Sequence, residues 1–234
     1  MKKVLGILGG MGPAATVDLF GLITSRTRAE RDGDHIRVVI DSNSAIPDRT
    51  AAILHGGADP LPEMLSALRH LESCGAQCVI LPCNTAHFFL PRLREKTDVP
   101  ILDMLAIAAA RCAELFPGKR AAVLATSGTL ATGLYEAALQ KAGVEYLLPD
   151  EAEQKILMHL IYDVVKASRP MEPERATWRA LLDRLREKGA EVFILGCTEL
   201  PLLSAALGEE GPFLNPTAEL ARAAILFCGY EVKE

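Results

Sequence analysis

Two stretches of the sequence share one pattern, and they decide the fold: GAQCVILPCNTAH at residues 75–87 and GAEVFILGCTELP at residues 189–201. Each begins with a Gly-Ala step, continues through a short apolar run and reaches a cysteine at the same distance from the glycine. A short apolar run that follows a helix-ending glycine is typical of a buried parallel strand. We therefore expect Cys83 and Cys197 at the carboxyl ends of two strands, where open α/β sheets bind ligands.

The composition is that of an ordinary globular protein. The chain has 234 residues, 50% of them hydrophobic and 24% charged, which is enough for one domain or two small ones. Its net charge of -5 argues against nucleic acid as a partner, and no apolar run reaches membrane-spanning length. The basic start, Met1-Lys2-Lys3, is not followed by a signal-peptide cleavage site. These features predict a cytoplasmic protein that binds neither nucleic acid nor membrane.

The remaining cysteines indicate packing rather than metal binding. No cysteine or histidine spacing is typical of a zinc site, so we expect no metal, and a cytoplasmic location favours reduced thiols. Cys74, Cys78, Cys112 and Cys228 lie in apolar contexts and are expected to be small buried hydrophobic residues.

Strands alternate with helices along the whole chain, which predicts parallel sheets with right-handed crossovers. The expected strands are 3–8, 36–40, 78–81 and 100–102 in the first half, and 120–125, 144–148, 192–195 and 213–214 in the second. We expect an α/β protein of two pseudosymmetric lobes, each a short four-stranded parallel sheet flanked by helices, with the active site in the cleft between them. The last helix is expected to return to the first lobe, which gives lobes of 1–99 plus 209–234 and of 100–208.

The two strand-end cysteines indicate acid/base chemistry. A thiol has a pKa near 8.5, and a helix N-terminus lowers it. Each of the two cysteines precedes a predicted helix. If one thiol removes a proton from a carbon and the other delivers a proton from the opposite face, a stereocentre is inverted without a cofactor. The alternative is a pair of unrelated core cysteines.

Polar residues next to the cysteines fit a small carboxylate ligand. Backbone N–H groups at helix N-termini bind carboxylates. The residues that stand at such positions are Asn84, Thr85, Thr126, Ser127 and Thr198. Their alternative role is ordinary N-capping, which is favoured for Thr129.

Charged residues near the strand ends offer further contacts. Arg49 lies in a polar loop after the second strand, and arginine binds carboxylates with two parallel hydrogen bonds. Lys166 ends a predicted helix that starts at 151, where a surface charge is the usual alternative. His87 could form a nucleophile pair with Cys83, but a satisfied polar residue in the wall is favoured. Candidate partners behind the site are Asp48, Asp103 and Glu199, of which Glu199 is the most suggestive because it follows Cys197 by two residues. Glu199 is also a candidate substrate contact.

One motif supports a different class of enzyme. The segment 10–15 fits G-x-G-x-x-A after the first strand, and Asp41 ends the second strand, as in a dinucleotide-binding protein. Pro13 removes an N–H group that a pyrophosphate would need, so a dinucleotide-dependent oxidoreductase is the less favoured alternative.

Five segments carry a resemblance to a known family: 6–16 (GILGGMGPAAT), 46–50 (IPDRT), 82–87 (PCNTAH), 125–129 (ATSGT) and 196–200 (GCTEL). Together they resemble the aspartate/glutamate racemase superfamily, and most closely its amino-acid (aspartate) racemase branch. In the glutamate racemase branch the second Cys-Thr pair is followed by His. Here Glu199 follows it, which indicates the aspartate type.

The resemblance implies a two-thiol racemase without pyridoxal phosphate or another cofactor, acting on a small amino acid and usually a homodimer. The implied acid/base pair is Cys83 and Cys197. The implied substrate contacts are Asn84, Thr85 and Thr198 for the α-carboxylate and amine, Arg49 and Lys166 for a distal carboxylate, and Met11 from the first loop.

The substrate implied first is aspartate. Glutamate, a broader range of amino acids, or maleate or hydantoin isomerisation stay open within the superfamily. A non-catalytic protein that binds small anions is the remaining alternative.

Overall fold

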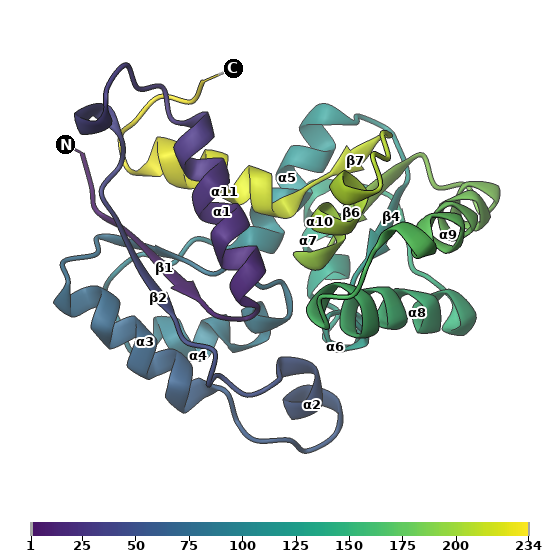
Figure 1. The fold of residues 1–234 in the computed structure, drawn as a ribbon, viewed down its shortest axis with the longest axis horizontal. Coiled ribbons are helices and arrows are strands. Elements are labelled where there is room, and N and C mark those ends of the chain that lie inside the picture. The colour runs from purple at the N-terminus through teal and green to yellow at the C-terminus, as the bar shows by residue number, and fades with distance from the viewer. Residues whose placement is uncertain (1, 234) are drawn as a thin grey trace. The chain divides into compact units, whose positions relative to one another are not determined.

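Residues 2–233 are described by a computed structural model, in which the chain divides into two units (Figure 1). The first unit combines the residues up to Ile107 with those from Thr217 onward, and the second runs from Ala108 to Pro216. Each unit has a parallel sheet flanked by helices, which confirms the predicted α/β class. The predicted lobe boundaries, 1–99 with 209–234 and 100–208, stay a prediction.

The sheet of the first unit has three strands rather than the four expected. They are β1 (Leu5–Gly9), β2 (Val38–Ser42) and β3 (Cys78–Ile80), in the order β2-β1-β3 and all parallel. The predicted strand 100–102 supplies only a single parallel bridge, between Ile101 and Val79. This paired segment does not extend into a strand because the chain turns at Asp103. The Asp103 side chain accepts hydrogen bonds from two backbone amides at the start of the next helix.

The helices of the first unit close around this sheet. They are α1 (Pro13–Arg26), η1 (Asp32–Asp34), α2 (Arg49–Leu54), α3 (Leu61–Ser73), η2 (Thr85–Phe89), α4 (Leu90–Arg94), α5 (Met104–Leu115) and α11 (Pro216–Phe227), with α5 crossing the division between the units.

Helix α1 is shorter than the sequence predicts. Apolar residues at helical spacing predict a helix over 14–31, but Thr27 adopts extended backbone and forms an antiparallel bridge with Val232. The C-terminal segment thus runs beside the end of α1, and the Cys228 carbonyl accepts a hydrogen bond from the Lys3 N–H. Contacts this distant in sequence outweigh the local preference for helix.

The second unit has a four-stranded sheet, as predicted. Its strands are β4 (Ala121–Leu124), β5 (Tyr146–Leu147), β6 (Val192–Leu195) and β7 (Phe213–Leu214), in the order β5-β4-β6-β7 and all parallel. The helices are α6 (Ser127–Ala131), α7 (Leu134–Ala142), α8 (Glu151–Met158), η3 (His159–Lys166), η4 (Glu172–Glu174), α9 (Arg175–Glu187) and α10 (Glu199–Ala206). The segment 151–166 was expected to be one continuous helix, but its second half is wound as a π-helix.

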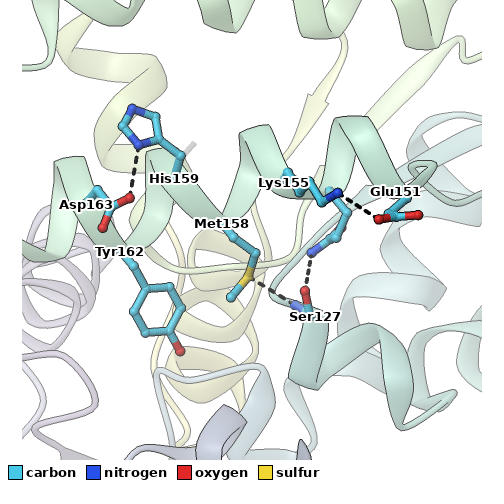
Figure 2. A pocket seen from close by; sticks show the side chains of 8 residues that line it. Ser127, Glu151, Lys155, Met158, His159, Tyr162 and Asp163 are labelled. Carbon is cyan, nitrogen blue, oxygen red and sulfur yellow. Dashed lines mark hydrogen bonds and ion pairs between the residues drawn. The ribbon is translucent and has the colours of Figure 1, made fainter.

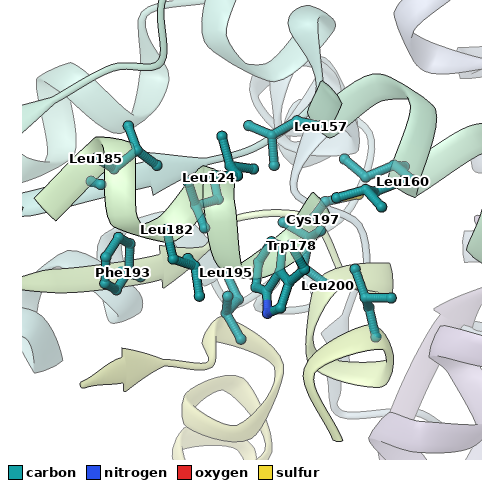
Figure 3. Close-up of a cluster of buried hydrophobic side chains, with 14 of the residues drawn as sticks. Leu124, Leu157, Leu160, Trp178, Leu182, Leu185, Phe193, Leu195, Cys197 and Leu200 are labelled. Atoms are coloured by element: carbon teal, nitrogen blue, oxygen red, sulfur yellow. The ribbon is translucent and has the colours of Figure 1, made fainter. Parts of the chain in front are cut away.

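The core of the second unit packs helix faces against the strand β6. Leu182 and Leu185 on α9 contribute to it together with Trp178, which is fully buried (Figure 3). The Trp178 ring stacks on Phe213 with 6.4 Å between ring centroids. Cys197 belongs to this cluster, so its backbone is anchored in the hydrophobic core of the unit.

The two repeated segments begin with the same helix stop. Gly75 and Gly189 both have left-handed backbone, with φ of 85° and 95°. In each case the glycine N–H bonds three residues back and the following alanine N–H bonds five residues back, which is a Schellman motif. The shared Gly-Ala step therefore marks a helix end just before a strand in both units.

The two sheets also share one strand order. In chain order, both run second, first, third, with a fourth segment beyond the third. The chain direction across such a sheet reverses between the first and third strands, and that switch point is where ligands bind at the carboxyl ends of strands. Cys83 follows β3 and Cys197 follows β6, which are the third strands of the two units. None of the helices between residues 2 and 233 is long and apolar enough to span a membrane.

Candidate active site

In the first unit Cys83 lies in the turn between β3 and the short helix η2 (Thr85–Phe89). The residue is 6% exposed and belongs to an apolar cluster that also holds Met11. Asn84 and Thr85 come directly after it and are buried as well. The segment was expected to enter an α-helix directly, but its first turn is a 3₁₀ helix. Cys83 is thus a packed residue on a tight turn rather than a surface thiol.

His87 holds this turn in place. Its Nδ1 lies 2.9 Å from the Cys83 carbonyl oxygen, and its Nε2 lies 3.0 Å from the Met104 backbone N–H, which donates to it. Because Nε2 accepts this bond, the proton of the neutral ring belongs on Nδ1, from which it donates to the carbonyl. Burial lowers the pKa of His87, which favours the same neutral form. His87 is therefore a satisfied structural residue, as favoured from the sequence, and not the base of a Cys–His pair.

The loop after β1 is fixed by its own hydrogen bonds. The Gly10 N–H donates to the Thr16 hydroxyl at 2.9 Å. Gly10 has φ of +92°, and a Cβ placed on it would lie 2.3 Å from backbone atoms of Asn43. Glycine is required here by close backbone packing, and the first amide of the turn is already occupied. Both findings argue against the dinucleotide-binding alternative, as does the hydrogen bond that joins Asp41 to His70.

Arg49 ties two loops of the first unit together. Its Nη1 donates to the carbonyls of Ile46 and Pro47, at 3.3 and 3.0 Å, and its Nη2 donates to the Met11 carbonyl at 3.2 Å. The side chain is buried. These bonds place the guanidinium beside the loop after β1, from which Met11 is expected to contact the substrate.

Two acidic residues that were candidates for partners behind the site have a simpler role. Asp48 accepts a hydrogen bond from the Ala51 N–H and caps α2, while Asp103 caps α5. Both positions stand where an aspartate satisfies amides at a helix start.

In the second unit Cys197 meets a carboxylate. Its Sγ lies 2.9 Å from Oε2 of Glu199, and the Thr198 hydroxyl donates to the same oxygen at 3.1 Å. All three residues are buried, Cys197 at 7% and Glu199 at 4% exposed. A carboxylate acts only as an acceptor, so the thiol proton points to Glu199. Glu199, a candidate partner behind the site and a candidate substrate contact from the sequence, therefore touches the sulfur directly.

The surroundings of Cys197 favour its neutral thiol. Burial raises the pKa of Cys197 well above its ordinary value, and the negative charge of Glu199 raises it further. The Lys166 ammonium acts in the opposite sense and lowers this pKa, as does the Glu199 backbone N–H. Lys166 stands at the end of η3 with its Nζ 4.3 Å from the centre of the Tyr162 ring. The charge of Lys166 therefore acts on the same sulfur as Glu199.

An open pocket of about 560 Å³ lies where β4 ends in the second unit (Figure 2). Ser127 lines it, and its N–H is 3.3 Å from the Met158 sulfur while Gln154 donates to its hydroxyl at 3.1 Å. Thr126 caps α6 by accepting from the Thr129 N–H, so the N-capping alternative holds for this hydroxyl.

The charged side chains at the rim of this pocket form pairs of opposite charge. Lys155 pairs with Glu151 at 2.7 Å, and His159 pairs with Asp163 at 3.0 Å. The bond to Asp163 raises the pKa of His159. These residues, with Gln154 and Met158, were not predicted from the sequence, and the only signal was the helical spacing that places them on one face of 151–163.

The cysteines outside the site fulfil the prediction with one exception. All six cysteines are free, and Cys78, Cys112 and Cys228 are buried. Cys74 was expected to be buried and is exposed. Cys74 is the C-cap residue of α3, so it lies beyond the last helical turn and outside the buried face of the helix. Within residues 2–233 no group of three or more His, Cys, Asp or Glu side chains gathers as a metal site would require.

Fold and site together define an α/β protein in which each unit carries a buried cysteine at the end of its third strand. The model of the Asp/Glu/Hydantoin racemase family matches residues 8–224. The chain therefore belongs to this family, which confirms the resemblance found in the sequence.

Relatives within the family differ in the substrates that their names give. The chain is 26% identical over 226 residues to the broad-specificity amino-acid racemase RacX of Bacillus subtilis (strain 168), covering 95% of this chain and 96% of the relative. It is 28% identical over 202 residues to the glutamate racemase of Desulforudis audaxviator, covering 82% and 72%. The solved structure of Picrophilus torridus aspartate racemase is similar with a TM-score of 0.86 and 29% identity, covering 99% of this chain and 96% of that one.

Proposed function

We propose that this member of the racemase family interconverts L- and D-aspartate without pyridoxal phosphate or another cofactor, using Cys83 and Cys197 as its acid/base pair. One observation carries the proposal. Each of two units with the same strand order has a buried cysteine just after its third strand, at the start of a helix. That position is the ligand-binding edge of an open α/β sheet.

The proposed reaction moves two protons and needs no redox partner. One cysteine thiolate takes the α-proton: its sulfur forms an S–H bond, and the electron pair of the C–H bond stays on carbon. The other cysteine then gives its thiol proton to the opposite face of the planar carbanion and becomes a thiolate. The roles exchange for the other enantiomer. In this scheme backbone N–H groups and the side chains of Asn84, Thr85 and Thr198 hold the α-carboxylate while charge develops.

Aspartate is the proposed substrate for two reasons. The likeness to the Picrophilus torridus aspartate racemase covers nearly the whole of both chains. In addition, the ammonium of Lys166 acts on the sulfur of Cys197, so a cation is available near the proposed reaction centre for a distal carboxylate. In the same scheme Met11, Thr126 and Ser127 line the substrate from the segments after the first strands of the two units, and Arg49 lines it from the start of α2, after β2.

Broad specificity is the second candidate. The likeness to RacX also spans nearly both chains. Arg49 directs three hydrogen bonds to backbone carbonyls, a use that holds loops together and does not by itself select an acidic side chain. If Lys166 alone attracts a distal carboxylate, discrimination between aspartate and neutral amino acids is modest.

The test of the two-thiol scheme is the activity of Cys83→Ala and Cys197→Ala. Each variant is expected to lose racemisation of aspartate by about 10²–10⁴-fold, the contribution of one positioned acid or base. Cys74→Ala removes an exposed cysteine of the first unit and is the matched control, with unchanged rates expected. Either single active-site variant racemising at the parent rate would show the scheme to be wrong.

The substrate is tested with a panel read by chiral chromatography. It contains both enantiomers of aspartate, glutamate and homoserine, with maleate and a hydantoin for the other reactions of the superfamily. A rate for aspartate far above all others supports the specific enzyme, and similar rates across the panel support the broad one. Turnover of maleate or hydantoin alone contradicts both.

The proposal also covers the oligomeric state and the cellular location of the enzyme. We propose a homodimer in the cytoplasm, on the basis of the family resemblance and of the sequence composition. Light scattering coupled to size-exclusion chromatography measures the mass, and a single 25.2 kDa species at working concentration would contradict the dimer.

A further inference from the structure

The two cysteine turns differ at one chemically decisive position. Two residues after Cys83 the chain has Thr85, and two residues after Cys197 it has Glu199. The Glu199 carboxylate is buried and lies 2.9 Å from the Cys197 sulfur. A duplicated pattern has thus acquired an ionisable partner on one of its two thiols.

The geometry of this carboxylate suits a partner for a protonated thiol. Two donors converge on its Oε2, the Cys197 thiol and the Thr198 hydroxyl at 3.1 Å. Both donors come from neighbouring residues at the start of α10, so their directions are fixed by the backbone. If the thiol lost its proton to solvent, two negative charges would stand at hydrogen-bond distance in a buried place.

The other charged group near the sulfur does not cancel this effect. Lys166 approaches from η3 and favours the thiolate, but its ammonium also lies over the Tyr162 ring at 4.3 Å. Burial and Glu199 together outweigh it, and the pKa of Cys197 is raised on balance. Among residues 2–233, these are the two charged groups that act on the sulfur, one from α10 and one from η3.

We propose that Glu199 is a positioning residue that holds Cys197 as the protonated thiol, so that in the resting enzyme Cys197 is the proton donor and Cys83 the proton acceptor. The consequence for racemisation rests on the proposed function. The enantiomer that Cys83 deprotonates then finds Cys197 in its favoured protonated form. The other enantiomer needs Cys197 as thiolate, which Glu199 disfavours, and Cys83 as the protonated thiol.

This role also applies after each turnover. When Cys197 has given its proton to the carbanion, its thiolate stands beside the Glu199 carboxylate. Their mutual repulsion raises the proton affinity of the pair and favours uptake of a proton from solvent or from Cys83. Glu199 thereby drives the enzyme back to one starting form, and Thr198 fixes the direction of the carboxylate.

The first test measures the thiol itself and requires no substrate. The rate of alkylation of Cys197 by iodoacetamide is followed against pH in the full-length protein, with the Cys197 peptide quantified by mass spectrometry. Glu199→Gln keeps the shape of the side chain and removes its charge. We expect the alkylation profile to move to lower pH by about one unit or more, which is about tenfold more thiolate at a given pH below the midpoint.

Two further variants separate this role from a merely structural one. Glu199→Asp retains a carboxylate and should leave the profile closer to that of the parent. Glu153→Gln makes the same substitution at another buried glutamate of the unit, which accepts a hydrogen bond from the N–H of Asp150, the N-cap of α8, and should leave the Cys197 profile unchanged. An unshifted profile in Glu199→Gln, with a parent-like circular dichroism spectrum, would overturn the proposal.

The second test reads the consequence in turnover. In a kcat/KM profile against pH, the alkaline limb reports the group that must be protonated in the free enzyme. Glu199→Gln should move this limb to lower pH for both enantiomers of aspartate alike, because an equilibrium constant of one for racemisation makes their kcat/KM values equal at every pH. The inequality of the two thiols should instead appear in KM measured for each enantiomer separately, and Glu199→Gln should change the ratio of the two KM values. An unmoved limb, or a ratio of the two KM values that Glu199→Gln leaves unchanged, would overturn the assignment of Cys197 as resting donor. If no amino acid is racemised by the parent while the alkylation profile shifts, the proposed function fails and the pairing of Glu199 with Cys197 is supported.

Discussion

Replacing His87 by alanine perturbs the turn that carries Cys83 without touching the sulfur. In the folded protein the imidazole bridges the Cys83 carbonyl and the Met104 N–H, at 2.9 and 3.0 Å. Both residues are buried, so the alanine variant leaves one acceptor and one donor without this partner. The turn is then held only by its neighbours, and α5 loses a contact at its first residue.

The size of the effect is set by these two bonds. A buried donor or acceptor left unsatisfied costs about 1–3 kcal/mol, so two of them predict a loss of about 2–6 kcal/mol in the free energy of unfolding. The space left by the ring adds to this loss, because buried cavities are destabilising. A loss of this size is a large share of the stability of an ordinary domain.

The same residue predicts how stability depends on pH. Burial lowers the pKa of His87 below its ordinary value of 6.5, so the unfolded chain takes up a proton before the folded one does. The contribution of His87 is therefore complete above about pH 6.5 and is lost as the pH falls below this value towards the folded pKa. Over that window the slope approaches about 1.4 kcal/mol per pH unit for one proton.

The assay is urea unfolding followed by circular dichroism over a range of pH, with the exchange rate of the Met104 amide as a local readout. His70→Ala is the matched control, since it removes a histidine of the same unit whose side chain is 73% exposed. The reasoning is refuted if His87→Ala is as stable as the parent at pH 8. It is also refuted if this variant loses stability below pH 6.5 as steeply as the parent does.

Three other substitutions test the packing around the two cysteine turns. Gly10→Ala should lower the free energy of unfolding in urea by about 1–3 kcal/mol, because the φ of Gly10 is +92° and a Cβ would lie 2.3 Å from backbone atoms. Gly33→Ala is the control and should be near neutral, since a Cβ there meets nothing within 4 Å. Trp178→Ala should cost about 3–5 kcal/mol because the ring is fully buried, and a loss below about 1 kcal/mol would contradict its place in the core. Gly196→Ala puts a Cβ 3.0 Å from a tyrosine ring and 3.1 Å from a backbone oxygen. It should therefore displace Cys197 and lower kcat by about 10²-fold. A parent-like kcat would contradict the need for this close approach.

The parts of the fold that could be predicted from the sequence depend on neighbours along the chain. The apolar runs at 192–195 and 213–214 form strands with those bounds, and the helix stops at Gly75 and Gly189 result from glycine conformation alone. The same runs place Cys83 and Cys197 just after strands. These features need no knowledge of the segments that pack against them.

The parts that were missed depend on contacts between distant residues. Helix α1 ends early because Thr27 pairs with Val232. The segment at Ile101 stays a bridge because the next helix begins at once. No local propensity indicates either outcome, nor the π-helix that replaces the second half of the expected helix from Glu151 to Lys166.

Side-chain roles were harder to predict than positions, and Arg49 shows why. An arginine in a polar loop suits either a carboxylate ligand or backbone carbonyls, and both uses have the same sequence signature. The structure gives it three carbonyl partners. Likewise Asp48 has the position of an acid near the site and is a helix cap. The sequence supplies the donors and acceptors, but the path of the neighbouring backbone decides which of them meet.

The two cysteine turns are alike in the strands that lead to them and unlike in the residues beside and beyond the sulfur. Pro82 precedes Cys83, and the turn continues into a 3₁₀ helix that His87 fastens. Gly196 precedes Cys197, where a Cβ would lie 3.1 Å from the Leu124 carbonyl oxygen, and the chain enters α10 with a carboxylate against the sulfur. Racemisation at a carbon requires two groups that can exchange roles, but it does not require that they be equal. The repeated strand order supplies two thiols that can exchange roles. The residues one and two positions beyond each cysteine then set how far the two thiols differ.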